Sequence, residues 1–290
     1  MQKQWQIRGL DIELTTAKPW IMGVLNVTPD SFSDGGCYRE LNSAAKQALL
    51  MQKQGAQIID IGGESTKPGA QIISEQEELA RVIPVIKAIR KCSKVYLSID
   101  TTKSSVARAA IEAGADIIND ISGLEQDSHM LQVALDNPQV AIVVMHRQGL
   151  SKYMQDAPTY NHVVADVASY LQARYLALTK AGIAANRLCF DPGIGFGKTL
   201  QHNLALIKHL EKLRVNNCPL LLGLSRKSMF GHCLSHGATE PDNEMKLNLR
   251  EAPTAALTGY TAQNGADIIR VHDVQLNQKV LRGMSLIQPS

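Results

Sequence analysis

Features that mark several protein classes are missing from this sequence, and each absence narrows what the chain can be. No apolar run approaches the roughly 18 residues that a membrane-spanning helix requires, so we expect no membrane partner. The amino-terminal segment lacks the apolar core of a signal peptide. The five cysteines are odd in number, form no C-x-x-C pair and have no zinc-ligand spacing, so we expect reduced thiols and a cytoplasmic location.

Aromatic residues and excess charge are also scarce. Phe, Trp and Tyr make up 4% of the 290 residues and hydrophobic residues 44%, so a large core must consist mainly of aliphatic side chains. The formal net charge is only +3 and no basic stripe is interleaved with aromatics, so we expect no nucleic-acid partner. A small charge of this kind still permits a local anion site.

A short repeat indicates the architecture. The pattern Gly-Ala-x-Ile-Ile followed by a polar residue occurs at 55–60, 114–119 and 265–270. Each copy follows a helix-like stretch, so we interpret the glycine as a helix cap, the isoleucines as a buried strand and the sixth residue as its polar end. Other apolar runs with this pattern bring the number of expected strands to eight. They lie near 21–25, 57–61, 95–99, 116–118, 140–145, 187–190, 219–224 and 267–271.

Segments with helical periodicity separate these strands, and Ser74 followed by Glu77 is typical of a helix-capping box. Apolar strands that alternate with helices pair in parallel, and eight such units predict a single-domain (β/α)₈ TIM barrel over residues 1–290, with its core at about 20–285. An open doubly wound sheet has the same alternation, but no G-x-G-x-x-G opens the first unit. The expected helices include 43–54, 74–90, 103–113, 160–181, 200–213 and 251–264.

In a barrel of parallel strands, the carboxyl ends of all strands open at one mouth, where polar residues that end the strands converge. The set found here combines carboxylates, amides and cations, which suits a polar heterocycle together with an anion. It comprises Asn26, Glu64, Thr66, Asp100, Asn119, His146, Asp191, Ser225, Lys227, Arg270 and His272.

Two adjacent strand ends indicate recognition of a heterocycle. Asp100 accepts hydrogen bonds only, whereas Asn119 both donates and accepts, so the pair can read opposite edges of a nitrogen-containing ring. The alternative is that both only satisfy loop backbone groups. Asn26 and Asp34 supply two further oxygens, a set that suits Mg²⁺ with water and phosphate as its other ligands.

Cations follow the last two strands. Arg270 and His272 are two residues apart and point to the same side, which suits a di-anionic group such as pyrophosphate. The alternative is an ion pair with Asp267 or Asp273. Segment 225–228, Ser-Arg-Lys-Ser, is predicted to open a helix whose free N–H groups favour an anion, although its lysine is equally compatible with a solvated surface position.

The segment 191–199, DPGIGFGKT, looks like a phosphate-binding loop, but only three residues separate Gly193 from Gly197 where that motif requires four. We therefore expect Asp191 to end a strand and face the mouth while the glycines permit a tight turn. The alternative is that Asp191 only initiates the turn before Pro192.

Taken in order, the blocks NVTPDSFSDGG, IDIGGESTKPGA, SIDTTK, INDISG, MHRQG, DPGIGFGK, SRKSM and RVHDV resemble the dihydropteroate synthases of folate biosynthesis. The resemblance extends over about residues 20–275. It implies a (β/α)₈ barrel, usually a homodimer, that joins p-aminobenzoate to 6-hydroxymethyl-7,8-dihydropterin diphosphate. The products are 7,8-dihydropteroate and pyrophosphate.

The resemblance also assigns roles by motif position. It implies that Asp100, Asn119, Asp191 and Lys227 hold the pterin, that Met145 packs near its ring, and that Phe196 also binds substrate. It implies that the diphosphate is bound by Asn26, Arg270 and His272, with Mg²⁺ held by Asn26 and Asp34. It implies that the aminobenzoate is surrounded by Phe32, Thr66, Lys67, Pro68 and Ser225, with loops 28–38 and 63–72 closing over it. The implied catalytic residues are Asn26, Asp34, Lys227, Arg270 and His272.

Two positions depart from the family pattern. Lys67 stands where many members have arginine, and 232–253 resembles the family poorly, so we assign that region no catalytic role. Two other functions remain as alternatives. A pterin-binding methyltransferase would not need the SFSDGG loop or the Arg270 and His272 pair, and a catalytically silent paralogue would be expected to lose them.

Overall fold

The computed structural model describes residues 3–15, 18–27, 37–65, 71–149, 154, 158–231 and 248–286, with 37–40 described by backbone only. Eight parallel strands pair in the order β8-β7-β6-β5-β4-β3-β10-β9. A parallel bridge between Phe190 and Leu220 joins the two ends of this order, so the predicted (β/α)₈ barrel is confirmed. The strands are β3 (Trp20–Asn26), β4 (Ile58–Gly62), β5 (Tyr96–Asp100), β6 (Ile117–Asp120), β7 (Ala141–Met145), β8 (Leu188–Asp191), β9 (Leu221–Gly223) and β10 (Ile268–Val271).

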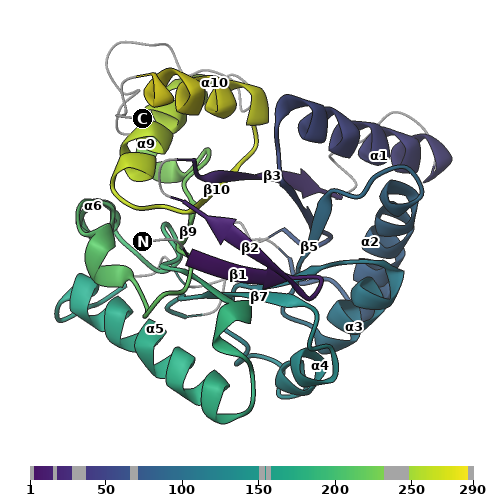
Figure 1. Ribbon diagram of the computed structural model, residues 1–290, viewed down its shortest axis with the longest axis horizontal. Helices are drawn as coiled ribbons and strands as arrows, with labels where there is room; N and C mark the ends of the chain where they lie inside the picture. The colour runs from purple at the N-terminus through teal and green to yellow at the C-terminus, as the bar shows by residue number, and fades with distance from the viewer. Residues whose placement is uncertain are drawn as a thin grey trace.

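Helices surround the barrel (Figure 1). The side chain of Ser74 caps α2 (Glu75–Arg90) by accepting a hydrogen bond from the N–H of Glu77, which is one half of the predicted capping box, whereas the Glu77 carboxylate accepts from Arg81. The expected helix 200–213 is divided, because α6 ends at Lys208 and a 3₁₀ turn, η3 (Leu210–Leu213), follows. The helices are α1 (Cys37–Gln54), α2 (Glu75–Arg90), α3 (Ser104–Ala113), α4 (Met130–Asp136), α5 (Val163–Lys180), α6 (Leu200–Lys208), α9 (Glu251–Gln263) and α10 (Val274–Ser285). Within the described ranges, no helix is long and apolar enough to cross a membrane.

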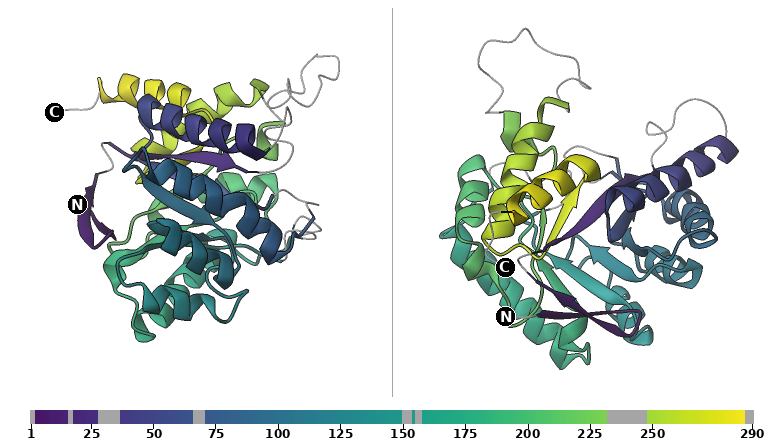
Figure 2. Two further views of the ribbon diagram at one scale, coloured as in Figure 1. Left: turned by 90° about the vertical axis from the view of Figure 1, so that its right-hand side faces the viewer. Right: turned by 45° about the horizontal axis from the view of Figure 1, so that its top comes forward.

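An amino-terminal hairpin, which the sequence reading did not predict, closes one end of the barrel (Figures 1 and 2). Strands β1 (Lys3–Ile7) and β2 (Leu10–Leu14) pair antiparallel through a two-residue turn in which Arg8 and Gly9 have φ of 55° and 70°. Trp5 is fully buried against the amino ends of the barrel strands, and its Nε1 donates to the carbonyl oxygen of Arg187 at 3.0 Å. Because the hairpin covers the amino end of the barrel, the carboxyl end is the one available for a binding site.

Candidate functional site at the carboxyl end of the barrel

The inward-facing side chains change from apolar to polar along the strands. Near the amino ends, Met22, Ile58 and Leu221 belong to one buried cluster that includes the hairpin. Side chains two positions apart on a strand share a face, so the next inward residues lie one layer closer to the mouth. On five strands these next residues are polar: Asp60, Ser98, Asn119, Asp191 and Arg270.

Arg270 lies between two carboxylates. Its Nε donates to Oδ2 of Asp60 and its Nη2 to Oδ2 of Asp100, both at 2.6 Å. The sequence offered Asp267 or Asp273 as alternative ion-pair partners of Arg270, and neither is correct. Asp267 lies at the amino end of β10, and Asp273 accepts a hydrogen bond from the first turn of α10. Arg270 is therefore a cation inside the barrel, and the two carboxylates fix its orientation. Its third nitrogen, Nη1, takes part in neither of these two hydrogen bonds.

Asp100 and Asn119 are register partners on β5 and β6, which confirms that they end neighbouring strands. The amide Nδ2 of Asn119 donates to Oδ2 of Asp60 at 3.1 Å. Among the described residues, Oδ1 of Asp60 and Oδ1 of Asp100 are buried and have no hydrogen-bond partner. Burial raises the pKa of Asp100 to about 7, although the charge of Arg270 opposes the shift. Buried acceptors of this kind favour a ligand that brings N–H groups.

Asp191 ends β8 at the mouth and also initiates the following turn. The two roles that the sequence presented as alternatives are therefore both compatible with the structure. Its Oδ1 accepts from the N–H of Gly193 at 2.7 Å, and burial raises the pKa of Asp191 to about 6, opposed by that bond and by Lys227. Gly193 has φ of 67°, and a Cβ there would lie 1.9 Å from the carbonyl oxygen of His146. Only glycine fits this turn.

A buried lysine anchors the same loop from inside. The Nζ of Lys198 donates to the carbonyl oxygens of Gly193 at 2.9 Å and Phe196 at 3.0 Å. It also lies 3.0 Å from Nδ1 of His146. His146, which the sequence grouped with the residues of the mouth, is buried and supports the loop.

An apolar surface borders the polar groups. The side chains of Ile121, Met145, Met154 and Phe196 form a separate buried cluster. The Nζ of Lys227 lies 4.0 Å from the centre of the Phe196 ring. Burial, with the charge of Arg270, lowers the pKa of Lys227 to about 8. Phe196 thus brings this apolar cluster, which includes Met145, next to the Lys227 cation.

Ser225 and His272 meet where β9 and β10 end. The Oγ of Ser225 lies 2.9 Å from Nδ1 of His272 and accepts from the N–H of His272 at 3.2 Å. The helix predicted to open at segment 225–228 is a single 3₁₀ turn, η4 (Ser228–Phe230), in the described part of the chain. The structure therefore brings these two predicted residues together. The described residues end at Gly231 here, so the extent of the predicted helix lies outside them.

The first turn of α9 holds the intervening residue, Arg226, in a left-handed conformation with φ of 60°. The N–H of Arg226 donates to Oγ1 of Thr254 at 3.2 Å, and its guanidinium is hydrogen-bonded to Glu251. The Nη1 of Arg250 donates to the carbonyl oxygen of Arg226 at 3.1 Å. Residues 248–253, the described part of region 232–253, thus support the loop that carries the predicted site residues Ser225 and Lys227.

Asn26, Gly62 and Asp100 lie side by side in register on β3, β4 and β5. A Cβ at Gly62 would lie 3.9 Å from Oδ1 of Asn26 and 3.8 Å from Oδ2 of Asp100, so the glycine leaves space between two oxygen-bearing side chains. Such oxygens suit Mg²⁺, which retains water and phosphate ligands, and Asn26 therefore fits the predicted metal site. In the described ranges no three His, Cys, Asp or Glu side chains gather as a metal cluster.

Several predicted site residues lie outside the described residues, as do most of loop 28–38 and the middle of loop 63–72. They are Phe32, Asp34, Thr66, Lys67 and Pro68. The described start of the second loop is tied to the barrel, because Nζ of Lys103 bonds Oε2 of Glu64 and Oε2 of Glu78, both at 2.6 Å.

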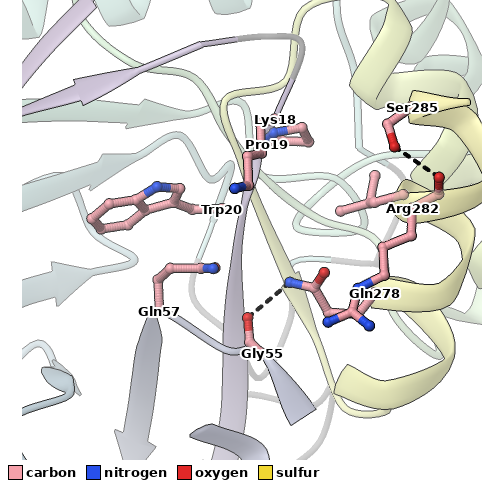
Figure 3. A pocket seen from close by; sticks show the side chains of 9 residues that line it. Lys18, Pro19, Trp20, Gly55, Gln57, Gln278, Arg282 and Ser285 are labelled. Atoms are coloured by element: carbon pink, nitrogen blue, oxygen red, sulfur yellow. Dashed lines mark hydrogen bonds between the residues drawn. The ribbon is translucent and has the colours of Figure 1, made fainter. Parts of the chain in front are cut away.

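A pocket of about 630 Å³ lies at the opposite end of the barrel, where β3 and β4 begin (Figure 3). Trp20, Gln57 and Gln278 line it, and Nε2 of Gln278 donates to the carbonyl oxygen of Gly55 at 2.8 Å. No predicted site residue lines this pocket, so it is separate from the mouth.

Sequence reasoning missed the central acceptor, Asp60, and the loop anchor, Lys198. Asp60 was recognisable as the polar sixth residue of the first repeat, equivalent to Asn119 and Arg270 in the other copies. Lys198 belongs to the glycine-rich segment, and its burial gives no signal in the sequence.

Comparison with known proteins identifies the family of this chain. The pterin binding enzyme family matches residues 22–272. The dihydropteroate synthase of Escherichia coli K12 is 45% identical over 275 residues, which are 95% of this chain and 93% of that protein. The chain is also similar to two solved dihydropteroate synthases.

The structure from Xanthomonas albilineans with 4-aminobenzoic acid is 38% identical, with a TM-score of 0.87 and coverage of 100% of both chains. The structure from Burkholderia cenocepacia with 7,8-dihydropteroate is 37% identical, with a TM-score of 0.86 and coverage of 99% of this chain and 97% of that one. These relatives favour the synthase over the methyltransferase and the silent paralogue. The chain belongs to the pterin-binding enzyme family and, within it, to the dihydropteroate synthases.

Proposed function

We propose that this protein joins 6-hydroxymethyl-7,8-dihydropterin diphosphate to p-aminobenzoate, releasing pyrophosphate and forming 7,8-dihydropteroate. The observation that carries the proposal is the mouth itself, where buried carboxylates of Asp100 and Asp191 face the cations Lys227 and Arg270 beside an apolar surface. A pterin has N–H donors along one edge, ring acceptors along another and a flat apolar face. Each has a matching group here.

Each part of the pterin has an assigned contact in this proposal. The carboxylates of Asp100 and Asp191 accept from its amino and ring N–H groups, and Asn119 pairs with the adjacent edge of the ring. Met145 and Phe196 pack near the ring, which orients its methylene carbon toward the last two strands.

The diphosphate leaves from the end of the mouth where Arg270 and His272 lie. Breaking the carbon–oxygen bond moves negative charge onto pyrophosphate, and the guanidinium of Arg270 stabilises that charge electrostatically. Lys227 holds its proton below about pH 8 and adds a second cation beside the ring. Mg²⁺ held by Asn26 and Asp34 supplies further positive charge at the leaving group when bound.

The electron pair of the aryl amine then forms the carbon–nitrogen bond, and the amine loses one proton to the released pyrophosphate or to solvent. That amine is already neutral near pH 7, so no strong general base is needed. Thr66, Lys67, Pro68, Phe32 and Ser225 surround the aminobenzoate, with the 28–38 and 63–72 loops excluding water that would capture the electrophile. Sulfonamides, which imitate p-aminobenzoate, compete for this position.

We further propose that the protein is a homodimer and that it acts in the cytoplasm. The described cysteines, Cys92, Cys189 and Cys218, are free thiols, which agrees with a reducing compartment. Sedimentation of the purified protein tests the dimer.

The reaction is tested by measuring pyrophosphate release from the pterin diphosphate, with and without p-aminobenzoate and with and without Mg²⁺. Release that requires both the amine and the metal supports the synthase. Binding of the pterin without any release contradicts it.

A further inference from the structure

We propose that Asp60 is a positioning residue, which fixes the polar atoms that Asn119 presents to the pterin ring and that Arg270 presents to its diphosphate. This inference rests on the proposed function. Asp60 lies in the middle of β4, faces the barrel interior and is fully buried. It belongs to the layer directly below the mouth, so it supports the residues that the substrate would contact.

One oxygen of Asp60 holds two site residues from different strands. Its Oδ2 accepts from Nε of Arg270 at 2.6 Å and from Nδ2 of Asn119 at 3.1 Å. These residues are 210 and 59 positions away in the sequence, on β10 and β6. The carboxylate therefore joins strands β4, β6 and β10 below the pterin site.

This contact determines the orientation of the Asn119 amide. A carboxylate accepts hydrogen bonds and donates none, so the amide must turn its Nδ2 toward Asp60. The carbonyl oxygen Oδ1 of Asn119 and the second amide proton are then left for the ligand. With another residue at position 60, the amide is free to flip and present the wrong pattern to the heterocycle.

The same contact fixes the plane of the Arg270 guanidinium. Nε is held by Asp60 and Nη2 by Asp100, so Nη1 is the nitrogen that remains for a substrate oxygen. If Asp100 turns from Arg270 to an N–H group of the pterin, Asp60 still holds Nε. Asp60 thus keeps the cation in place while its neighbour binds substrate.

A matched pair of variants tests this role. Asp60→Asn keeps the shape of the side chain but removes its charge and gives Arg270 and Asn119 a competing donor. Ser98→Ala is the control, because Ser98 is the register partner of Asp60 on β5, is equally buried, and its Oγ has no hydrogen bond among the described residues. Asp60→Ser is the second variant in case Asp60→Asn does not fold, since a short hydroxyl cannot hold both partners.

Binding of 6-hydroxymethyl-7,8-dihydropterin is measured by calorimetry, and KM values for the pterin diphosphate and p-aminobenzoate by pyrophosphate release. We expect about 10-fold or greater weakening for both pterin compounds in the Asp60 variants, because bonds to charged groups are lost, with KM for p-aminobenzoate and the Ser98→Ala values near wild type. Equal losses for both substrates, or wild-type pterin affinity, would overturn the role of Asp60 alone. Wild-type protein that binds no pterin would overturn the proposed function as well.

Discussion

The side chains of Lys198 and His146 are hydrogen-bonded to each other in the protein interior, with 3.0 Å between Nζ and Nδ1. Burial lowers the pKa of Lys198 to about 7, and burial together with the charge of Lys198 lowers the pKa of His146 to about 3. The imidazole is therefore neutral at physiological pH and can accept at Nδ1. This pair joins the end of β7 to the glycine-rich loop, which carries Phe196, one of the predicted site residues.

Replacing Lys198 with methionine should loosen this loop. Methionine has a similar length but donates no hydrogen bond, so the carbonyl oxygens of Gly193 and Phe196 lose their donor. We expect a loss of about 1–3 kcal/mol in the free energy of unfolding together with weaker pterin binding. Urea denaturation and calorimetry measure the two effects. Lys208→Met, on the exposed side of α6, is the control, and an equal change in both variants would contradict the anchoring role.

The titration of Asp100 should appear in pterin binding. Burial raises its pKa to about 7, against the charge of Arg270 and with contributions from Asp60, Glu78 and Asp120. Only the carboxylate accepts two N–H groups, so affinity should rise with pH through about 7. Calorimetry between about pH 5 and about pH 9 would reveal this step. It should be absent in Asp100→Asn, and its survival there would assign it to another group.

The same shift in Asp100 affects folding stability with a definite sign. The pKa rises from its ordinary value of 3.8 to about 7, so the folded state keeps a proton that the unfolded state releases in this window. The contribution of Asp100 to stability is therefore largest below pH 3.8 and is lost as pH rises through about 7.

Lys227 should limit activity on the alkaline side. Its pKa is lowered to about 8, so deprotonation removes a cation beside the ring above that pH. We expect kcat/KM for the pterin diphosphate to fall above about pH 8, and the fall to move to higher pH in Lys227→Arg, because guanidinium stays charged. A profile that is identical in the variant would show that a different group titrates.

The contact between α9 and Arg226 should matter for the site without touching substrate. In Glu251→Gln the guanidinium loses its charged partner, so the left-handed residue between Ser225 and Lys227 is held less firmly. We expect a loss of about 1–2 kcal/mol in stability and weaker pterin binding, measured by denaturation and calorimetry. The control is Glu112→Gln, an exposed position on α3. Unchanged pterin affinity in Glu251→Gln would rule out a positioning effect.

The amino-terminal hairpin should contribute substantially to stability through Lys3. The Nζ of Lys3 bonds both oxygens of buried Asp267, at 2.5 and 2.6 Å. Lys3→Ala leaves that carboxylate with the N–H of Leu220 at 2.9 Å and the more distant Arg214 at 3.5 Å, so we expect a loss of about 3 kcal/mol in unfolding free energy. Denaturant titration measures it against Lys279→Ala, an exposed position on α10. A loss no larger than in that control would argue that the hairpin is dispensable.

The sequence by itself determined the barrel and most of the mouth. Apolar strands buried on both faces pair in parallel, and parallel strands bring their carboxyl ends to one side, so the positions of Asp100, Asn119 and Asp191 followed from local pattern. The hairpin was also encoded locally, in the alternation around Trp5 and the turn at Arg8 and Gly9.

Only the tertiary structure decided which polar side chains pair with one another. Asp60 and Arg270 are 210 positions apart, and their bond depends on strand stagger and on the rotamers of both side chains. Neither quantity is a property of a local segment. The same holds for Lys198 with His146 and for Arg226 with Glu251, since each pair consists of residues that are distant in the sequence and that only the folded chain brings into contact. Local sequence thus determined where polar groups gather, whereas packing determined their hydrogen bonds and pKa values.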